Sequence, residues 1–212
     1  MDVARTEEEQ LEALKKWWAQ NGISIITGVV LGIVAIFGWR GWQAHLQEQA
    51  EAASGLYSEL IVNIRQEKLD EARVQANEIL ENYEGTGYAQ FAALLLARIE
   101  IDGNNHDAAI KQLHWVMDNA KQEELKHLAR LRIARLYLSD DKPKLALELL
   151  DVKDYGSFTA SYEETRGDIY IRLNQPDKAR EAYKNALSTI NDTTRENSYL
   201  QLKLDDIGRD SN

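Results

Sequence analysis

The sequence predicts an all-α protein in which one N-terminal transmembrane helix is followed by a solenoid of helical hairpins. Three observations support this prediction. An uncharged run near the N-terminus is long enough for a helix to cross a bilayer. Beyond it, apolar residues recur at helical spacing. Small residues recur there with a period of 33 to 37 residues, which is typical of stacked two-helix units.

The composition excludes several classes of protein. The chain has 212 residues, of which 35 are Asp or Glu and 25 are Lys or Arg, giving a formal charge of −10. Because phosphate binding needs a concentrated positive field, nucleic acid is not the expected partner. The absence of cysteine excludes disulfides, thiolate zinc sites and cysteine nucleophiles, but it leaves the compartment open. Only 2 prolines and 12 glycines favour helices over strands and turns.

The apolar run has the length and the flanks of a transmembrane helix. Gly22 to Trp39 contains no charged residue, and the uncharged stretch begins at Trp17. Trp17 and Trp18 precede the apolar core, while Trp39 and Trp42 close it, as expected for indole rings at both membrane interfaces. The distance from Trp18 to Trp39 along a helix is about 32 Å, close to the ~30 Å thickness of the hydrocarbon layer.

Basic residues near the run predict its orientation. Arg5, Lys15 and Lys16 precede it, whereas Arg40 is the only basic residue that follows before Arg65. By the positive-inside rule the N-terminus stays in the cytoplasm and the rest lies outside, which in a bacterium is the periplasm. The expected organisation is a cytoplasmic tail (1–16), an anchor with aromatic belts (17–42) and a periplasmic domain of about four helical hairpins (43–212).

Two alternatives to an anchor are a cleaved signal peptide and a buried core helix. The first small-x-small candidate for cleavage, Ala50-Glu51-Ala52, lies about a dozen residues too far downstream. A helix that is apolar on all sides, with tryptophans only at its ends, suits lipid better than a soluble core. Within the run, Gly28 and Gly32 form a GxxxG pair, a candidate contact face between two membrane helices, although glycine is frequent in such helices anyway.

Small residues act as markers of an internal repeat. They form pairs twelve residues apart, namely Ala97 and Ala109, Ala134 and Ala146, and Gly167 and Ala179. The pairs advance by 37 and then 33 residues, and Leu60 with Ala72 gives a fainter copy 37 residues upstream. Pro143 and Pro176 each lie three residues before a marker alanine, where a helix can start without the missing N–H.

This period resembles that of tetratricopeptide repeats, in which small residues let the two helices of a hairpin approach closely. The last copy matches the family's small and aromatic positions best, at Gly167, Tyr170, Ala179, Tyr183 and Ala186. Other copies depart from it, with non-aromatic residues where an aromatic is usual and an arginine at a common core position: Ala93, Arg130, Glu163 and Arg166. These departures affect the expected groove chemistry, whereas the hairpin architecture stands.

No motif predicts catalysis, a metal or a cofactor. No two histidines have the i, i+4 spacing of a zincin, since the histidines are His45, His106, His114 and His127. The Glu84-Gly85-Thr86-Gly87 segment lacks the third glycine and the preceding strand of a nucleotide-binding loop, so it reads as a turn. No GxSxG nucleophile motif is present. The sequence therefore predicts a protein that binds others and is not an enzyme.

The first helices of stacked hairpins line a concave surface, and the register places candidate binding residues there. Arg98, Arg135 and Asp168 occupy equivalent positions, and apolar residues surround them: Leu94, Ile101, Leu131, Leu138 and Ile171. Such a groove could hold an extended peptide or a partner helix through charge-assisted contacts on an apolar floor. The alternative is that these are ordinary solvated or packing positions.

Several segments together resemble the YfgM family of bacterial inner-membrane proteins. They are Gly28-Val29-Val30-Leu31-Gly32, Gly38-Trp39-Arg40, Ile133-Ala134-Arg135-Leu136 and Thr165-Arg166-Gly167-Asp168. The resemblance implies an ancillary subunit of the SecYEG translocon that faces the periplasm. It also implies association with a PpiD-like membrane-anchored chaperone and transfer of exporting chains to periplasmic chaperones.

Two other functions remain open from the residues alone. The first is a regulator of envelope stress signalling that sequesters a signalling protein, for which the acidic tail of residues 1–16 is available. The second is an envelope hydrolase, which lacks a recognisable nucleophile or metal cluster.

Overall fold

The expected all-α fold is confirmed by a computed structural model that describes residues 7–190 and 195–209. All regular secondary structure in these residues is helical. Residues 1–6, which include Arg5 of the expected tail, lie outside the described residues. The elements are α1 (Glu7–Arg65), α2 (Leu69–Asn82), α3 (Gly87–Asp102), α4 (His106–Asn119), α5 (Glu123–Ser139), α6 (Pro143–Leu149), the 3₁₀ turn η1 (Gly156–Phe158), α7 (Thr159–Arg172), α8 (Pro176–Thr189) and α9 (Arg195–Arg209).

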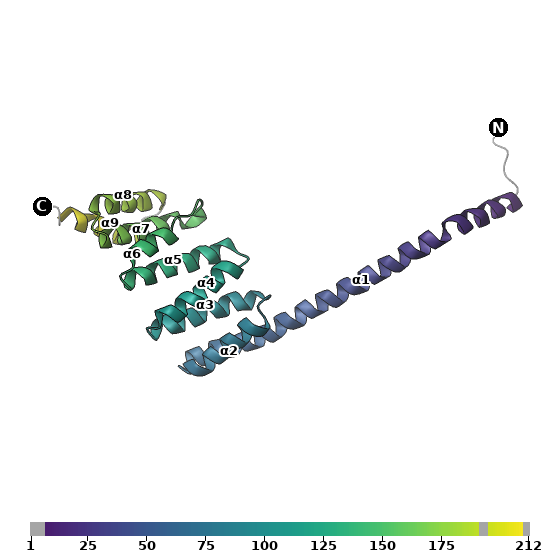
Figure 1. The fold of residues 1–212 in the computed structure, drawn as a ribbon, viewed down its shortest axis with the longest axis horizontal. Helices are drawn as coiled ribbons and strands as arrows, with labels where there is room; N and C mark the ends of the chain where they lie inside the picture. The colour runs from purple at the N-terminus through teal and green to yellow at the C-terminus, as the bar shows by residue number, and fades with distance from the viewer. Residues whose placement is uncertain (1–6, 191–194, 210–212) are drawn as a thin grey trace, which may run out of the picture. The chain divides into compact units, whose positions relative to one another are not determined.

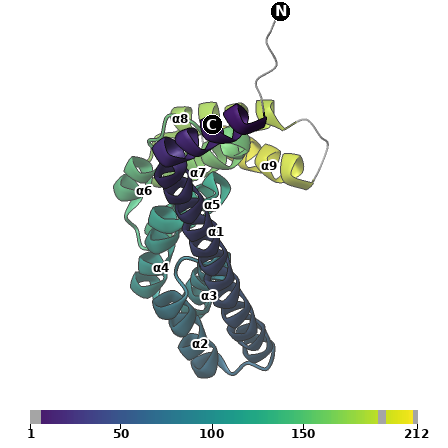
Figure 2. The ribbon, with the colours of Figure 1, turned by 90° about the vertical axis from the view of Figure 1, so that its right-hand side faces the viewer.

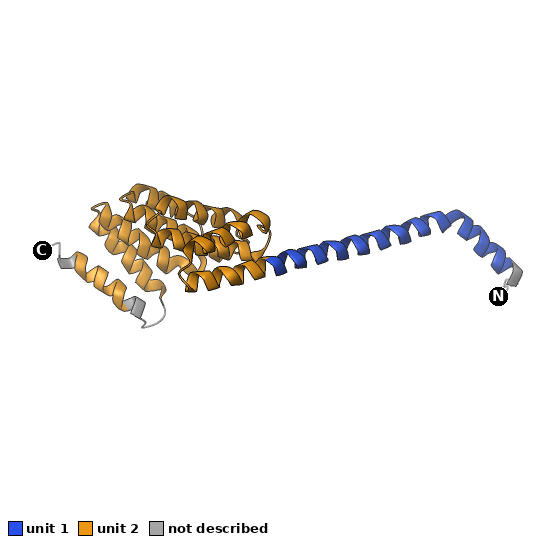
Figure 3. Cartoon of the chain, turned by 90° about the horizontal axis from the view of Figure 1, so that it is seen from below, with its two compact units in different colours: residues 1–52 blue, residues 53–212 orange. Residues whose placement is uncertain are grey.

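The chain divides into two compact units, residues 1–52 and 53–212 (Figure 3). Helix α1 forms the first unit, and its last turns, from residue 53 to Arg65, belong to the second. The expected domain boundary at 42/43 follows the last tryptophan of the aromatic belt, so it marks where the helix is expected to leave the membrane. It stays a prediction, because packing contacts and membrane position are different properties of a helix.

The first unit contains one helix that is long and apolar enough to cross a membrane, and no other helix in the described part of the chain passes this test. Only 6% of its most apolar 18-residue window is buried. A soluble core helix would be mostly buried, so that alternative is wrong for this unit. Gly28 and Gly32 are open, since a Cβ at either position would meet nothing within 4 Å.

The second unit is a solenoid of antiparallel helix pairs. The end of α1 pairs with α2 through a shared core cluster and side-chain hydrogen bonds. The pairs α3/α4, α5/α6 and α7/α8 follow in chain order, with α9 beyond α8 (Figures 1 and 2). Pro143 and Pro176 are the first residues of α6 and α8, as the repeat register predicts. Their fixed φ suits a first helical turn, where the missing N–H has no partner to lose.

The core is a series of clusters, each built by helices that are neighbours in the chain. Helix α3 belongs to two of them: Ala92 and Leu96 pack with α2 and the end of α1, whereas Ala93 and Ala97 pack with α4 and α5. A third cluster joins α5, α6 and α7, and a fourth joins α8 and α9. The repeat markers are all buried within this series: Ala97, Ala109, Ala134, Ala146, Gly167 and Ala179.

The turn between the two helices of each pair has the same backbone conformation. One residue there adopts a left-handed φ, at Glu67 (58°), Asn104 (57°), Asp141 (58°) and Asn174 (56°). The N–H of the following residue donates to a carbonyl five residues earlier, at 2.8–2.9 Å in every copy. This bond is typical of a Schellman motif, which satisfies carbonyls at the end of the first helix.

Glu67 is the least suited of these four residues to a left-handed φ, because Asn and Asp adopt that conformation more readily than Glu does. We expect Glu67→Gly to raise the free energy of unfolding by about 0.5–1 kcal/mol, since glycine adopts this φ without steric cost. Glu78→Gly is the control, because Glu78 is exposed inside helix α2 and glycine there costs about 1 kcal/mol. Thermal unfolding of the full chain in detergent, followed by circular dichroism, measures both. Equal losses from both variants would contradict the strained turn.

Candidate interaction surface

The expected groove residues lie on α3, α5 and α7, the first helices of three successive pairs, and all of them except Leu131 line one of two separate hollows. Arg98 and Arg135 lie together in one hollow, with Leu94 and Ile101. Asp168 lies in the other. The register therefore places these residues on the first helix of each pair, but it does not show that they divide between two hollows, both of which reach α5.

The first of these, which we call the arginine hollow, has a volume of about 530 Å³. Its walls combine aromatic and aliphatic side chains, of which Phe91 is the most exposed, with three arginines and one carboxylate. The lining residues are Tyr57, Phe91, Leu94, Leu95, Arg98, Ile101, Asp102, Arg132, Arg135 and Leu136. The helices that supply them are α3 and α5, together with Tyr57 from the end of α1.

Positive charge dominates the arginine hollow. Arg98 donates two hydrogen bonds from Nε to the Asp102 carboxylate, at 2.8 and 2.9 Å, and this contact raises the pKa of Arg98. Burial lowers the pKa of Arg132, and the charges of Arg98 and Arg135 lower it further. Neither Arg132 nor Arg135 forms an ion pair with any residue that the structure describes. The hollow therefore holds three like charges and a single counter-charge.

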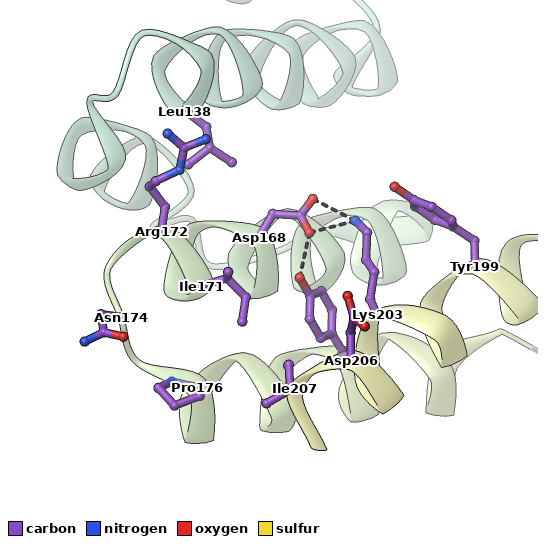
Figure 4. A pocket seen from close by; sticks show the side chains of 11 residues that line it. Leu138, Asp168, Ile171, Arg172, Asn174, Pro176, Tyr199, Lys203, Asp206 and Ile207 are labelled. Carbon is purple, nitrogen blue, oxygen red and sulfur yellow. Dashed lines mark hydrogen bonds and ion pairs between the residues drawn. The ribbon is translucent and has the colours of Figure 1, made fainter. Parts of the chain in front are cut away.

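The second, which we call the C-terminal hollow, has a volume of about 610 Å³ and lies among α5, α7, α8 and α9 (Figure 4). Besides Asp168 it is lined by Leu138 and Ile171 of the expected groove. Lys203 of α9 reaches Asp168 at 2.6 and 2.9 Å and Glu164 at 3.0 Å. The hydroxyl of Tyr183 donates to the same Asp168 carboxylate at 2.7 Å. Asp168 thus binds a helix of its own chain.

The pKa values of Lys203 and Tyr183 reflect this network. Burial alone lowers the pKa of Lys203, but the hydrogen bonds and charges of Asp168 and Glu164 outweigh it, so the net pKa is raised. Burial raises the pKa of Tyr183 strongly, and the carboxylate of Asp168 adds to the rise. Both groups therefore keep their protons, and with them the bonds to Asp168, well above neutral pH.

Leu131, another residue expected in the groove, lines neither hollow. It is 3% exposed and packs in the core with Ala134, Ala146 and Leu150. The reason is its place on α5, where the helix is covered by both α6 and α7. Leu94 holds the equivalent position on α3, yet it still reaches the arginine hollow.

The sequence profile of the tetratricopeptide repeat-like domain matches residues 15–209, which is nearly the whole chain and includes the apolar run. The chain belongs to this family.

Individual relatives extend the match. The "Ancillary SecYEG translocon subunit" of Escherichia coli (strain K12) is 28% identical over 207 residues, covering 98% of this chain and 99% of the relative. The protein of the same name in Haemophilus influenzae is 31% identical and covers 85% of this chain and 88% of its own. The one in Neisseria gonorrhoeae is 26% identical, at 95% and 97% coverage. The resemblance to the YfgM family is thereby confirmed.

Arg166 departs from the tetratricopeptide pattern for a local structural reason. Its guanidinium donates to the Leu150 carbonyl at 3.0 Å and to the Tyr155 hydroxyl at 2.6 Å, and it lies 5.2 Å from the centre of the Tyr155 ring. These contacts fasten the segment between α6 and η1 onto α7. The arginine therefore stabilises a long connection that a typical tetratricopeptide hairpin does not have.

The described part of this tetratricopeptide-like chain contains no cluster of three or more His, Asp or Glu side chains that could hold a metal. Two of its histidines have structural partners. His106, at the start of α4, contacts the carboxylate of Asp140 at the end of α5, and this contact lowers the pKa of Asp140. His127 contacts the hydroxyl of the buried Tyr162 at 2.8 Å. Both histidine contacts therefore join neighbouring helices of the solenoid.

The sequence did not reveal Arg132 or Lys203 as surface residues of interest. Arg132 precedes a buried isoleucine and has no counterpart in the marker register. Lys203 lies in a helix outside the repeat and pairs with residues 35 and 39 positions earlier. The only available signal was the amphipathic pattern of residues 199–207, which predicts a helix but not its contact.

Proposed function

We propose that this chain is a membrane-anchored interaction scaffold that acts, without catalysis, as an ancillary subunit of the Sec translocon. The observation that carries the proposal is the extent of the matches. Relatives named "Ancillary SecYEG translocon subunit" align with anchor and solenoid together, over 95% or more of this chain in the Escherichia coli and Neisseria gonorrhoeae cases. A shared repeat alone would align only with the second unit.

The proposed location is the inner membrane, with α1 crossing once. Lys15 and Lys16 lie before the apolar run, and Arg40 alone follows it closely, which favours a cytoplasmic N-terminus. The proposed division is a tail (1–16), an anchor (17–42) and a periplasmic domain (43–212). Gly28 and Gly32 are the proposed contact face of the anchor with another membrane helix.

The physical basis of such a role is local concentration. An anchor beside the translocon raises the effective concentration of the solenoid at the channel exit, so that weak contacts with emerging chains suffice. We further propose that the solenoid contacts a PpiD-like membrane-anchored chaperone and helps pass exported proteins to periplasmic chaperones. Its two hollows supply polar and apolar contact surface of the kind such encounters use.

Site-specific photo-crosslinking in intact cells tests this function. Probes at positions 98 and 135 are expected to form adducts with translocon subunits, periplasmic chaperones or exporting chains. A probe at Lys184, which is exposed on α8 outside both hollows, is the matched control. Adducts with cytoplasmic proteins alone would overturn the orientation.

A second measurement separates the translocon role from the regulator of envelope stress signalling. Deletion of residues 2–14, which removes the acidic residues of the tail but keeps Lys15 and Lys16 and with them the expected orientation, is expected to leave recovery of translocon subunits from gently solubilised membranes intact, because the proposed contacts belong to the exported unit. If this deletion abolishes that recovery, the acidic tail carries the interaction. Because the chain has no cysteine, a single engineered cysteine in the solenoid also reports its side of the membrane through an impermeant maleimide.

A further inference from the structure

The arginine hollow is positively charged, although the chain as a whole is negatively charged. The chain as a whole carries −10, yet Arg98, Arg132 and Arg135 converge here around Asp102 alone. Arg98 and Asp102 form an exposed pair, with side chains 70% and 54% exposed, which solvent screens. Three like charges held this close are mutually unfavourable unless an acidic group joins them.

The floor of the arginine hollow is apolar. Phe91 is 44% exposed, and Tyr57 lies 6.5 Å from it between ring centroids. Leu94, Leu95 and Ile101 line the same surface. A small inorganic anion would satisfy the arginines but leave this floor in water. The combination fits a ligand that brings carboxylates and apolar side chains together.

The C-terminal hollow shows how this solenoid face holds a helix. Asp168 is equivalent in register to Arg98 and Arg135, and α9 docks there through Lys203 (Figure 4). The same helix buries Leu200 and Ile207 against α8. An amphipathic helix with a charge opposite to the register residue is therefore the occupant seen at the third position. At the first two positions the register residue is a cation, and it is exposed, with no helix among residues 7–190 and 195–209 covering it.

From this arrangement we infer that the arginine hollow binds an acidic amphipathic helix of a partner protein. Carboxylates of that helix pair with Arg132 and Arg135, while its apolar side chains cover Phe91 and Tyr57. Recognition of an amphipathic helix in a groove has this division of roles. The chain's own α9 is held at Asp168 through Lys203, whose ammonium group the arginines of the hollow would repel. The inference deepens the interaction role proposed above and rests on it.

A binding measurement with a designed pair of peptides tests this surface. The probe is a fluorescein-labelled peptide of residues 195–209 that carries Lys203→Glu, and its control is the same peptide with Lys203 kept. Fluorescence anisotropy is recorded with the full chain in phosphatidylcholine nanodiscs. The Lys203→Glu peptide is expected to bind at least about tenfold more tightly than its control, because it presents a carboxylate where α9 presents an ammonium group.

Variants of the chain locate the binding. Arg98→Glu with Arg135→Glu is expected to weaken binding of the acidic peptide by about tenfold or more, and Arg98→Ala with Arg135→Ala to weaken it less. All four changes are at exposed side chains, so helicity by circular dichroism is expected to be unchanged. Arg180→Glu, on α8 outside both hollows, is the control and leaves binding as it was.

Three outcomes would overturn the inference. Equal or absent binding of the two peptides would remove the charge selectivity, and indifference to the arginine variants would place binding elsewhere. Loss of peptide binding in phosphatidylglycerol nanodiscs, at constant ionic strength, would show that lipid head groups occupy the hollow. Recovery of translocon subunits from membranes is a separate measurement, so a negative result with the peptides would contradict the helix-binding inference without contradicting the proposed translocon role.

Discussion

Replacing Gly167 with alanine is expected to lower the free energy of unfolding by about 1–3 kcal/mol, the usual cost of overpacking a core. A Cβ at this position would lie 2.2 Å from Cε1 and 2.5 Å from Cδ1 of Tyr183. The ring cannot move aside easily, because Tyr183 is 2% exposed and its hydroxyl is held by Asp168. Thermal unfolding measures the loss, since 1 kcal/mol shifts Tm by about 2–4 °C in a unit of this size.

The control is the same substitution at Gly55, in the part of α1 that belongs to the solenoid. A Cβ there meets nothing within 4 Å, so Gly55→Ala is expected to raise stability by about 0.5–1 kcal/mol through helix propensity. Tyr183→Leu combined with Gly167→Ala is expected to cost less than the sum of the two single losses, because the smaller side chain makes room for the methyl group. A Gly167→Ala variant as stable as the original would disprove the close approach of α7 and α8.

Replacing Lys203 with alanine is expected to release α9 from the solenoid. The change removes the donor to both Asp168 and Glu164, and hydrogen bonds between charged groups contribute about 1.5–3 kcal/mol each before solvent screening. Because the three side chains are 18–30% exposed, we expect a total loss of about 2–3 kcal/mol.

Hydrogen exchange shows where the effect of Lys203→Ala is located. Amides of α9 should exchange faster, whereas those of α3 and α4 should keep their rates, because packing in the solenoid is between neighbours. Arg180→Ala is the control, since its partner Asp177 is 95% exposed and such a pair contributes little. Uniformly faster exchange through the whole unit would contradict local release.

The same network predicts a loss of stability in alkali. The pKa values of Lys203 and Tyr183 are raised in the folded chain above their ordinary values of 10.5 and 10.0. A raised pKa means that the folded state holds the proton more tightly, so its stabilisation is complete below these values and is lost as pH rises through the folded pKa. We expect Tm to fall above about pH 10, and Lys203→Ala to show a smaller fall.

The parts of the structure that were predictable are those that depend on spacing along one helix or one hairpin. The marker pairs and the two prolines located the helix pairs, because a small residue at a close contact and a proline at a first turn are local requirements. Leu131 shows where spacing fails. It shares a register with Leu94, and both are buried, but Leu131 packs with α6 and α7 and lines no hollow, whereas Leu94 borders the arginine hollow.

The contact between Lys203 and Asp168 was not predictable for a related reason. It joins a repeat helix to a helix outside the repeat, so no periodicity relates the two residues. The interruption of the groove between two hollows has the same origin. Whether a surface is open depends on what the rest of the chain places over it, and only the folded structure contains that information.

The core clusters join helices that are neighbours in the chain, and this sets the order in which the protein can fold during its synthesis. Because chains fold from the N-terminus as they emerge, the cluster around Leu60 needs only residues up to Ile99, and the next needs only those up to Leu136. Each new hairpin therefore meets a finished packing surface. Asp168 and Glu164 must wait for the last helix, so the growing solenoid keeps a negatively charged end until Lys203 is added.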